Sequence, residues 1–170
     1  GDTIMRSLNL PVSGWQKIMG RLILGWRRPR RPILGMELAG EIEAVGRRAT
    51  RFQPGDTVCA STFAVHFGGY AEYKCLPGNG MLALNPANLT AEQAAGVPGA
   101  GMTAWHCLQK AKIQPGQKVL IYGASGAVGT YAVQIASRHF CADVTGVCSS
   151  ANVHLVQSIG RSEEHTSELQ

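Results

Sequence analysis

A glycine-rich loop is the part of the sequence whose residue types and spacing indicate chemistry most directly. An apolar run that ends at Tyr122 leads into Gly123-Ala-Ser-Gly-Ala-Val-Gly129, and a second apolar run, 130–136, follows it. Small residues let the backbone approach a pyrophosphate, and the first turn of a helix offers free N–H groups and a positive dipole end. The loop therefore predicts a dinucleotide-binding site, and a tight strand-to-helix turn that binds nothing is the alternative. The predicted binding residues are Ala124, Ser125, Gly126, Ala127, Val128 and Gly129.

The residues that follow the next predicted strand, 143–147, bear on which dinucleotide binds. They read Cys148-Ser149-Ser150, without the acidic residue that usually binds the ribose 2′-hydroxyl in NAD-selective sites. Hydroxyl groups can donate hydrogen bonds to a 2′-phosphate, so Ser149 and Ser150 favour NADPH, with NADH as the other possibility. No Arg or Lys lies nearby, and Ser149 is equally suited to cap the following helix.

The elements around this loop are predicted from the hydrophobic pattern. Strands at 118–122 and 143–147 on either side of a helix make a βαβ unit. Upstream, Thr90-Ala-Glu-Gln93 has the pattern of a capping box. We expect Pro98 and Gly99 to end that helix, and residues 102–111 to form another.

The preceding part of the sequence is predicted to be rich in short strands. The expected strands are 37–45, 57–60, 70–75 and 81–84. Gln53-Pro-Gly-Asp56 has the composition of a tight turn, because Pro fixes one φ and Gly supplies a positive one. Short strands separated by Gly and Pro favour an irregular β-barrel or sandwich.

A basic segment precedes these strands. Apolar residues recur at helical spacing over 15–27, and no acidic residue occurs between Asp2 and Glu37. A basic amphipathic helix is able to bind an anionic membrane or nucleic acid. We instead favour a solvated helix that covers a substrate cleft, because nothing else in the sequence resembles a nucleic-acid motif. We therefore expect neither nucleic acid nor a membrane as a partner.

Composition excludes several classes of protein. The 170 residues are 45% apolar and 16% charged, which is ordinary for a globular chain and unlike a disordered or fibrous one. No apolar run approaches the ~18 residues of a membrane span, and no secretory leader is visible. The five cysteines form no CxxC pair, so we expect reduced thiols in a cytoplasmic protein.

The last ten residues, 161–170, read Arg-Ser-Glu-Glu-His-Thr-Ser-Glu-Leu-Gln. This string matches one reading frame of a common sequencing-library adapter. A native helix with an acidic first turn is the alternative. Because a match of that length is improbable by chance, we expect 161–170 to be adapter-derived and leave it out of the fold.

Several stretches, in this order, resemble the medium-chain dehydrogenase/reductase superfamily. The likeness is greatest to its zinc-independent quinone oxidoreductase-like members, also labelled NAD(P)-dependent alcohol dehydrogenases. The stretches are 1–6, 32–46, 54–58, 68–73, 101–105 and 123–129. The resemblance implies an α/β plus β fold, with a partial GroES-like β-barrel as substrate domain over 1–86 and the first half of a Rossmann domain over 87–160. It also implies that the chain is an internal fragment, lacking the start of the barrel and inactive alone.

The resemblance further implies where the substrate and the nicotinamide lie. It places Met36, Phe63 and His66 in the substrate pocket. It places Thr103 beside the nicotinamide, although a hydrogen bond from Thr103 to its own helix backbone is the alternative. Zinc-dependent members have His where this chain has Met36, and Met is a poor ligand for catalytic zinc, so we expect no metal. The sequence supports no assignment of a catalytic acid.

Without a Lewis acid, hydride transfer best suits acceptors that are already electrophilic. We therefore expect the intact protein to be an NADPH-dependent oxidoreductase that reduces a quinone, an enone or a similar carbonyl. Its partner is then a small molecule, and we expect it to be a homo-oligomer. A metal-free NAD(P)-dependent alcohol or aldehyde dehydrogenase is the narrower alternative. A non-enzymatic module that binds anionic surfaces or nucleic acid is the alternative of another class.

Overall fold

The computed structural model describes residues 14–24 and 33–160, and the chain divides into two compact units, Gly1–Pro98 and Gly99–Gln170. The predicted boundary after Pro86 precedes this division, because the helix that follows Pro86 packs against the sheet of the first unit. The expected adapter tail, the 1–6 stretch and the last residues of the 15–27 helix lie outside the described residues.

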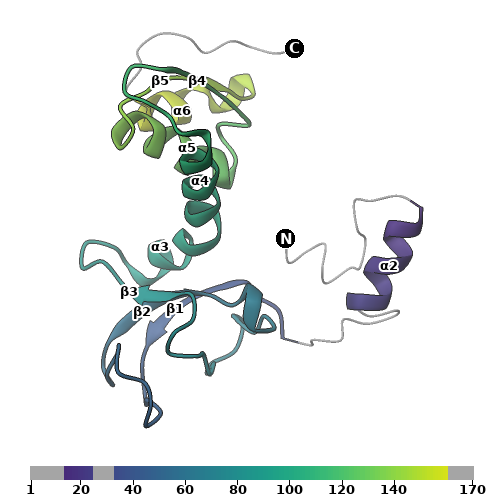
Figure 1. Ribbon diagram of the computed structural model, residues 1–170, viewed down its shortest axis with the longest axis vertical. Helices are drawn as coiled ribbons and strands as arrows, with labels where there is room; N and C mark the ends of the chain where they lie inside the picture. The colour runs from purple at the N-terminus through teal and green to yellow at the C-terminus, as the bar shows by residue number, and fades with distance from the viewer. Residues whose placement is uncertain (1–13, 25–32, 161–170) are drawn as a thin grey trace. The chain divides into compact units, whose positions relative to one another are not determined.

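The first unit is built on a three-stranded antiparallel sheet, in the order β1-β2-β3 (Figure 1). The strands are β1 (Glu37–Glu41), β2 (Thr57–Ser61) and β3 (Leu82–Leu84). The central strand carries the buried residues Val58, Cys59 and Ala60. The register pairs Leu38 with Ala60 and Val58 with Leu84, so the sheet buries the middle of β2.

The turn between β1 and β2 forms as its composition predicts. Gly55 has a φ of 90°, the left-handed region that favours glycine. The Gln53 N–H donates to Asp56 Oδ2 at 2.9 Å, and the Asp56 N–H donates to the Gln53 carbonyl at 3.2 Å. The predicted strand 37–45 ends sooner, at Glu41, although Ile42 still exchanges backbone hydrogen bonds with this turn.

The prediction of a strand at 70–75 was wrong. The Gly69 N–H, just before the segment, donates to the Gly35 carbonyl at 3.1 Å, and the Tyr70 N–H donates to the Leu34 carbonyl at 3.0 Å. The chain then bends, and Lys74 Nζ donates to the Val65 carbonyl at 3.1 Å. The alternating pattern suits a strand, but this backbone turns away from its neighbour after two hydrogen bonds.

The capping box predicted at Thr90 is present at the start of α3 (Ala91–Ala95). The Gln93 N–H donates to Thr90 Oγ1 at 3.3 Å, and the Thr90 N–H donates to Gln93 Oε1 at 3.0 Å. The predicted break at Pro98 and Gly99 was misplaced, because α3 ends at Ala95, with Gly96 as its C-cap, and α4 (Val97–Ala111) contains both residues. Pro98 lies in the first turn of α4, where a missing N–H costs nothing.

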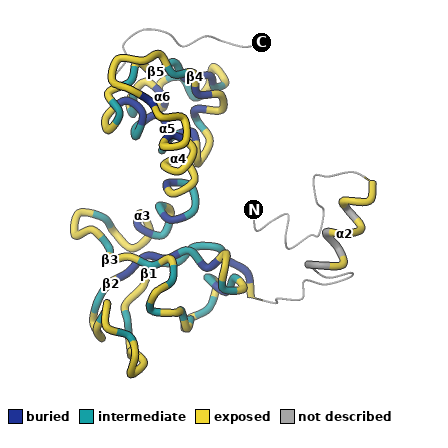
Figure 2. The backbone as a smooth tube through the Cα atoms, in the orientation of Figure 1, coloured by how far each residue is buried: buried dark blue, intermediate teal, exposed yellow. Residues whose placement is uncertain are grey.

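The second unit contains the predicted βαβ arrangement. Its elements after α4 are β4 (Lys118–Tyr122), α5 (Ala127–Arg138), β5 (Asp143–Val147) and α6 (Val153–Ile159). β4 and β5 are parallel, and α5 packs against both strands. Residues of α4 and α6 belong to the same buried cluster. Figure 2 marks the buried segments of α5 and β5 in dark blue. The core includes Ile121, Ala124, Val133, Ala136, Val144 and Val156.

The basic amphipathic segment forms a helix, α2 (Trp15–Leu24). Four of its apolar residues, Trp15, Ile18, Met19 and Leu22, are exposed. Among the described helices, none combines the length and the apolar character needed to cross a membrane.

Candidate functional site

The glycine-rich loop lies at the carboxyl end of β4 and is attached to the end of β5. Gly123 has a φ of 76°, which permits the sharp turn after Tyr122. The N–H groups of Gly123 and Ala124 both donate to the Val147 carbonyl at 2.9 Å. The ends of the two strands are therefore held together where the loop begins.

The first turn of α5 approaches the loop so closely that one position has no room for a side chain. A Cβ on Gly129 would overlap the Gly123 carbonyl oxygen and lie 2.8 Å from Ala124 Cα. Ala124, the first residue of the dinucleotide-binding pattern, is itself fully buried. Gly129 therefore allows the backbone of α5 to lie against the backbone of the loop.

The amino end of α5 has backbone donors without a side-chain cap. Gly126 is the N-cap residue, and the Thr130 N–H donates to its carbonyl at 2.9 Å. The N–H groups of Ala127, Val128 and Gly129 precede that hydrogen bond and therefore have no acceptor within the helix. Small residues, free N–H groups and the positive end of a 12-residue helix together fit the pyrophosphate of a dinucleotide.

Ser149 and Ser150 lie at the carboxyl end of β5, in the same unit as the loop. Ser149 precedes a short 3₁₀ turn, Ser150–Asn152, and its hydroxyl makes no capping hydrogen bond there. Both serines are exposed. The alternative role for Ser149, as a side-chain cap, is therefore not the one that the structure shows.

Asn152 is a residue of this site that the sequence analysis missed. Its Nδ2 donates to Ser149 Oγ at 3.0 Å and to Ser125 Oγ at 3.3 Å. It therefore brings together two of the predicted cofactor-binding residues, one from the loop and one from the end of β5. The only signal in the sequence was a carboxamide three residues after Ser149.

Thr103 lies on α4, and its side chain is exposed. Its Oγ1 donates to the Gly99 carbonyl at 2.7 Å, which is the local backbone bond considered as the alternative role. The hydroxyl oxygen retains the capacity to accept a hydrogen bond. Its position beside a nicotinamide stays a prediction.

The predicted substrate-pocket residues lie in the first unit. The Thr62 N–H donates to the Met36 carbonyl at 2.7 Å, which holds Met36 beside the 3₁₀ turn Phe63–Val65. Thr62 is fully buried, and its hydroxyl donates to the Gly35 carbonyl at 2.6 Å. Phe63 is 65% exposed and His66 is also exposed. The backbone therefore brings Met36 near Phe63, while Phe63 and His66 present their side chains to solvent.

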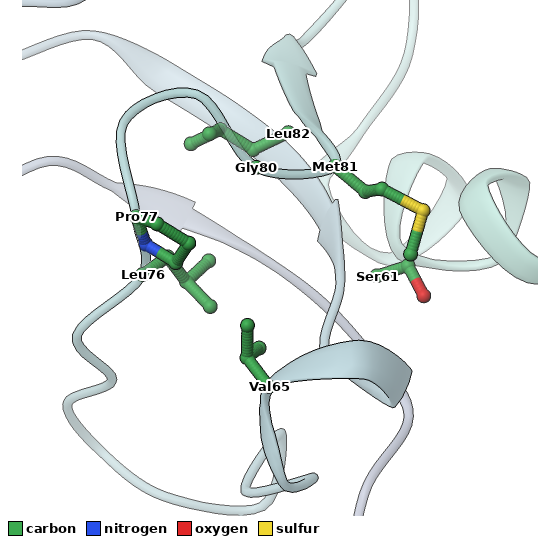
Figure 3. A pocket seen from close by; sticks show the side chains of 7 residues that line it. All are labelled: Ser61, Val65, Leu76, Pro77, Gly80, Met81 and Leu82. Atoms are coloured by element: carbon green, nitrogen blue, oxygen red, sulfur yellow. The ribbon is translucent and has the colours of Figure 1, made fainter.

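A small hollow lies next to this turn (Figure 3). Its volume is about 10 Å³, far below the ~300 Å³ at which small-molecule pockets usually begin. Met36, Phe63 and His66 do not line it, and the hollow alone does not form the predicted substrate pocket. Its lining residues are Ser61, Val65, Leu76, Pro77, Gly80, Met81 and Leu82.

Within residues 14–24 and 33–160, no three His, Cys, Asp or Glu side chains are grouped so as to hold a metal ion. His139 instead packs among aromatic rings. Its ring lies 4.8 Å from that of Trp105 and 4.9 Å from that of Phe140, measured between centroids.

Comparison with known proteins adds to this geometry. The sequence model of the family described as "Alcohol dehydrogenase GroES-like domain" matches residues 12–87. Mitochondrial NAD(P)H oxidoreductase RTN4IP1 of Mus musculus is 36% identical over 135 residues, covering 76% of this chain and 34% of that protein. Chloroplastic quinone-oxidoreductase QR1 of Triphysaria versicolor is 36% identical over 136 residues, covering 75% of this chain and 40% of that protein.

A solved structure, the quinone oxidoreductase from Coxiella burnetii, has a similar fold. It superimposes with a TM-score of 0.71 at 30% sequence identity, covering 79% of this chain and 42% of that chain. The predicted fold class, a GroES-like domain followed by the start of a Rossmann domain, is thereby confirmed. The chain spans 34% of the length of RTN4IP1 and 40% of the length of QR1.

Proposed function

This chain belongs to the medium-chain dehydrogenase/reductase superfamily, as a quinone oxidoreductase-like member, and on that premise we propose that the whole protein is an oxidoreductase that uses a nicotinamide cofactor. The observation that carries the proposal is the uncapped amino end of α5, packed through Gly129 against the loop that begins at Gly123. The finer proposal is a zinc-independent, NADPH-dependent reductase that transfers hydride to a quinone, an enone or a similar electrophilic carbonyl.

The residues of the second unit account for how the cofactor is held. The N–H groups of Ala127, Val128 and Gly129, in the first turn of α5, would donate to the pyrophosphate. Gly126 and Ala124 keep that end free of bulky side chains. When bound, the nicotinamide cofactor supplies the hydride, and the chain supplies the position from which it is transferred.

Preference for NADPH is supported by the end of β5. Ser149 and Ser150 offer hydroxyl groups, and no acidic residue occurs from Cys148 to Gly160 to repel a 2′-phosphate. Thr103 completes the proposed cofactor contacts beside the nicotinamide, and Met36, Phe63 and His66 line the proposed substrate pocket. Homo-oligomerisation and a cytoplasmic location stay predictions.

Independence from zinc is supported by Met36, which stands where zinc-dependent members have a histidine. The chain then has no Lewis acid with which to polarise an ordinary ketone, so reactivity depends on the electrophilicity of the acceptor. Quinones and enones meet that requirement. A polar side chain or the solvent provides the proton.

The proposal is tested with the whole protein, using NADPH and a panel of acceptors in the presence of a chelator. We expect quinones and enones to be reduced at the same rate with and without the chelator, and unactivated ketones to be poor substrates. A strict requirement for added zinc contradicts the metal-free proposal. Efficient oxidation of simple alcohols with either oxidised cofactor supports the alcohol dehydrogenase alternative instead.

A further inference from the structure

Asn152 links the two segments that the proposed cofactor site requires. Its Nδ2 donates to Ser125 Oγ in the glycine-rich loop at 3.3 Å and to Ser149 Oγ after β5 at 3.0 Å. Ser125 and Asn152 are 27 positions apart in the sequence and both are partly buried. The amide thus holds together two hydroxyl groups from separate segments.

The direction of these hydrogen bonds fixes what the hydroxyl groups offer to a ligand. A carboxamide NH₂ only donates, so both serine oxygens act as acceptors toward Asn152. Each hydroxyl still has one hydrogen, which must point to another acceptor. The hydroxyl hydrogens of Ser125 and Ser149 are consequently not used on the Asn152 NH₂ group and are available to a ligand that accepts.

We infer that Asn152 is a positioning residue that sets cofactor selectivity, by orienting Ser125 and Ser149 to donate to the 2′-phosphate of NADPH. This inference rests on the proposed function. A phosphate offers only acceptor oxygens at its ionised positions, and two outward hydroxyl donors match it. The 2′-hydroxyl of NADH is better matched by a site that presents an acceptor, such as the acidic residue of NAD-selective sites.

In the segment around β5, no positively charged side chain is present to favour NADPH over NADH. The sequence contains no Lys or Arg from His139 to Gly160, which includes β5 and the residues after it. Within this stretch the side-chain donors that are available to a phosphate are neutral, so their orientation matters for binding it. Hydrogen bonds to a charged group are stronger than those between neutral groups, by roughly twofold.

The substitution Asn152→Asp tests the orientation while preserving the shape of the side chain. The carboxylate only accepts, so both serine hydrogens turn inward to it and only oxygen lone pairs remain to face the ligand. We expect the dissociation constant of NADP⁺ to rise about 10- to 100-fold, because the serine donors are lost and the new carboxylate also repels the 2′-phosphate. That of NAD⁺ changes by less than about threefold, since no charged partner is lost.

The assay is isothermal titration calorimetry of the whole protein with NADP⁺ and with NAD⁺, which needs no turnover. Ser158→Asp is the matched control, because it places the same charge on α6 at an exposed side chain whose hydroxyl bonds only locally to the Leu155 carbonyl. Asn152→Ala is the second variant, since it removes the link without adding charge. We expect it to weaken NADP⁺ binding about tenfold, with a melting temperature that shows the fold is retained.

The outcomes separate this inference from the proposed function. A wild-type protein that binds neither dinucleotide overturns the proposed function. A wild-type protein that prefers NADP⁺, with a preference unchanged in both Asn152 variants, overturns only the inference. An equal loss of NADP⁺ affinity in Ser158→Asp also overturns it, because the effect is then one of general charge.

Discussion

Substitution of Gly129 by alanine tests whether α5 and the glycine-rich loop are packed backbone against backbone. The added methyl would overlap the Gly123 carbonyl oxygen and would lie 2.8 and 2.9 Å from Ala124 Cα and carbonyl carbon. All three are backbone atoms, so no side-chain rotation relieves the contact. The amino end of α5 has to move away from β4.

Two opposing effects decide the sign of the change in stability. Alanine is favoured over glycine within a helix by about 0.5–1 kcal/mol. Overpacking of a tight contact usually costs about 1–3 kcal/mol, and a clash with rigid backbone lies at or above the upper end. We therefore expect Gly129→Ala to lower the free energy of unfolding by about 2 kcal/mol, which lowers Tm by about 4–8 °C in a chain of this size.

Urea denaturation and thermal melting of wild type and variant measure this change. Gly126→Ala is the matched control in the same loop, because its Cβ would lie 3.3 Å from the Gly123 carbonyl oxygen and its φ of −76° suits any residue. We expect Gly126→Ala to lower the free energy of unfolding by less than about 1 kcal/mol. A Gly129→Ala protein as stable as wild type, or a control that costs as much, refutes the packing argument.

Three further changes test other parts of the structure. Gly146→Ala would place a Cβ 2.8 Å from Val156 Cγ1. We expect the free energy of unfolding, measured in urea, to fall by about 1–3 kcal/mol. The added substitution Val156→Ala should partly restore it. Thr62→Val removes the buried 2.6 Å hydrogen bond to the Gly35 carbonyl, and urea unfolding should show a loss of about 1–3 kcal/mol, whereas an unchanged midpoint contradicts that role. Thr90→Ala removes the cap of α3 and should cost about 1 kcal/mol.

The same capping box predicts a pH dependence. The backbone N–H of Glu92, and secondarily the Thr90 hydroxyl, lower the pKa of Glu92 below its ordinary value. A lowered pKa in the folded state contributes stability above the unfolded-state pKa, and this is lost as pH falls through the folded-state pKa. Stability measured from neutral to acid pH should therefore fall less steeply in Thr90→Ala than in wild type. An unchanged slope contradicts this account.

Local patterns were sufficient to predict the βαβ unit and the capping box. The apolar runs around Gly123-Ala-Ser-Gly-Ala-Val-Gly129 have the lengths and order that strand, loop and helix require, and the structure has those elements there. Thr90 and Gln93 satisfy each other across three positions, so no distant contact is needed. Such features are encoded within a few neighbouring residues.

Features that depend on distant contacts were missed. Residues 70–75 alternate as a strand does, but a strand also needs a partner along its length, and the backbone bends after Tyr70. The role of Asn152 depends on Ser125, which spacing alone does not bring near it. The substrate-pocket and nicotinamide contacts, at Met36, Phe63, His66 and Thr103, stay predictions for the same physical reason.

Oxidation of NADPH by the whole protein with a quinone acceptor, with NADH in a parallel reaction, tests the central claim most directly. The account predicts rapid loss of NADPH that depends on the quinone, and slower loss of NADH. Absence of quinone-dependent oxidation with either cofactor contradicts the claim that this loop binds a nicotinamide dinucleotide for hydride transfer to such an acceptor.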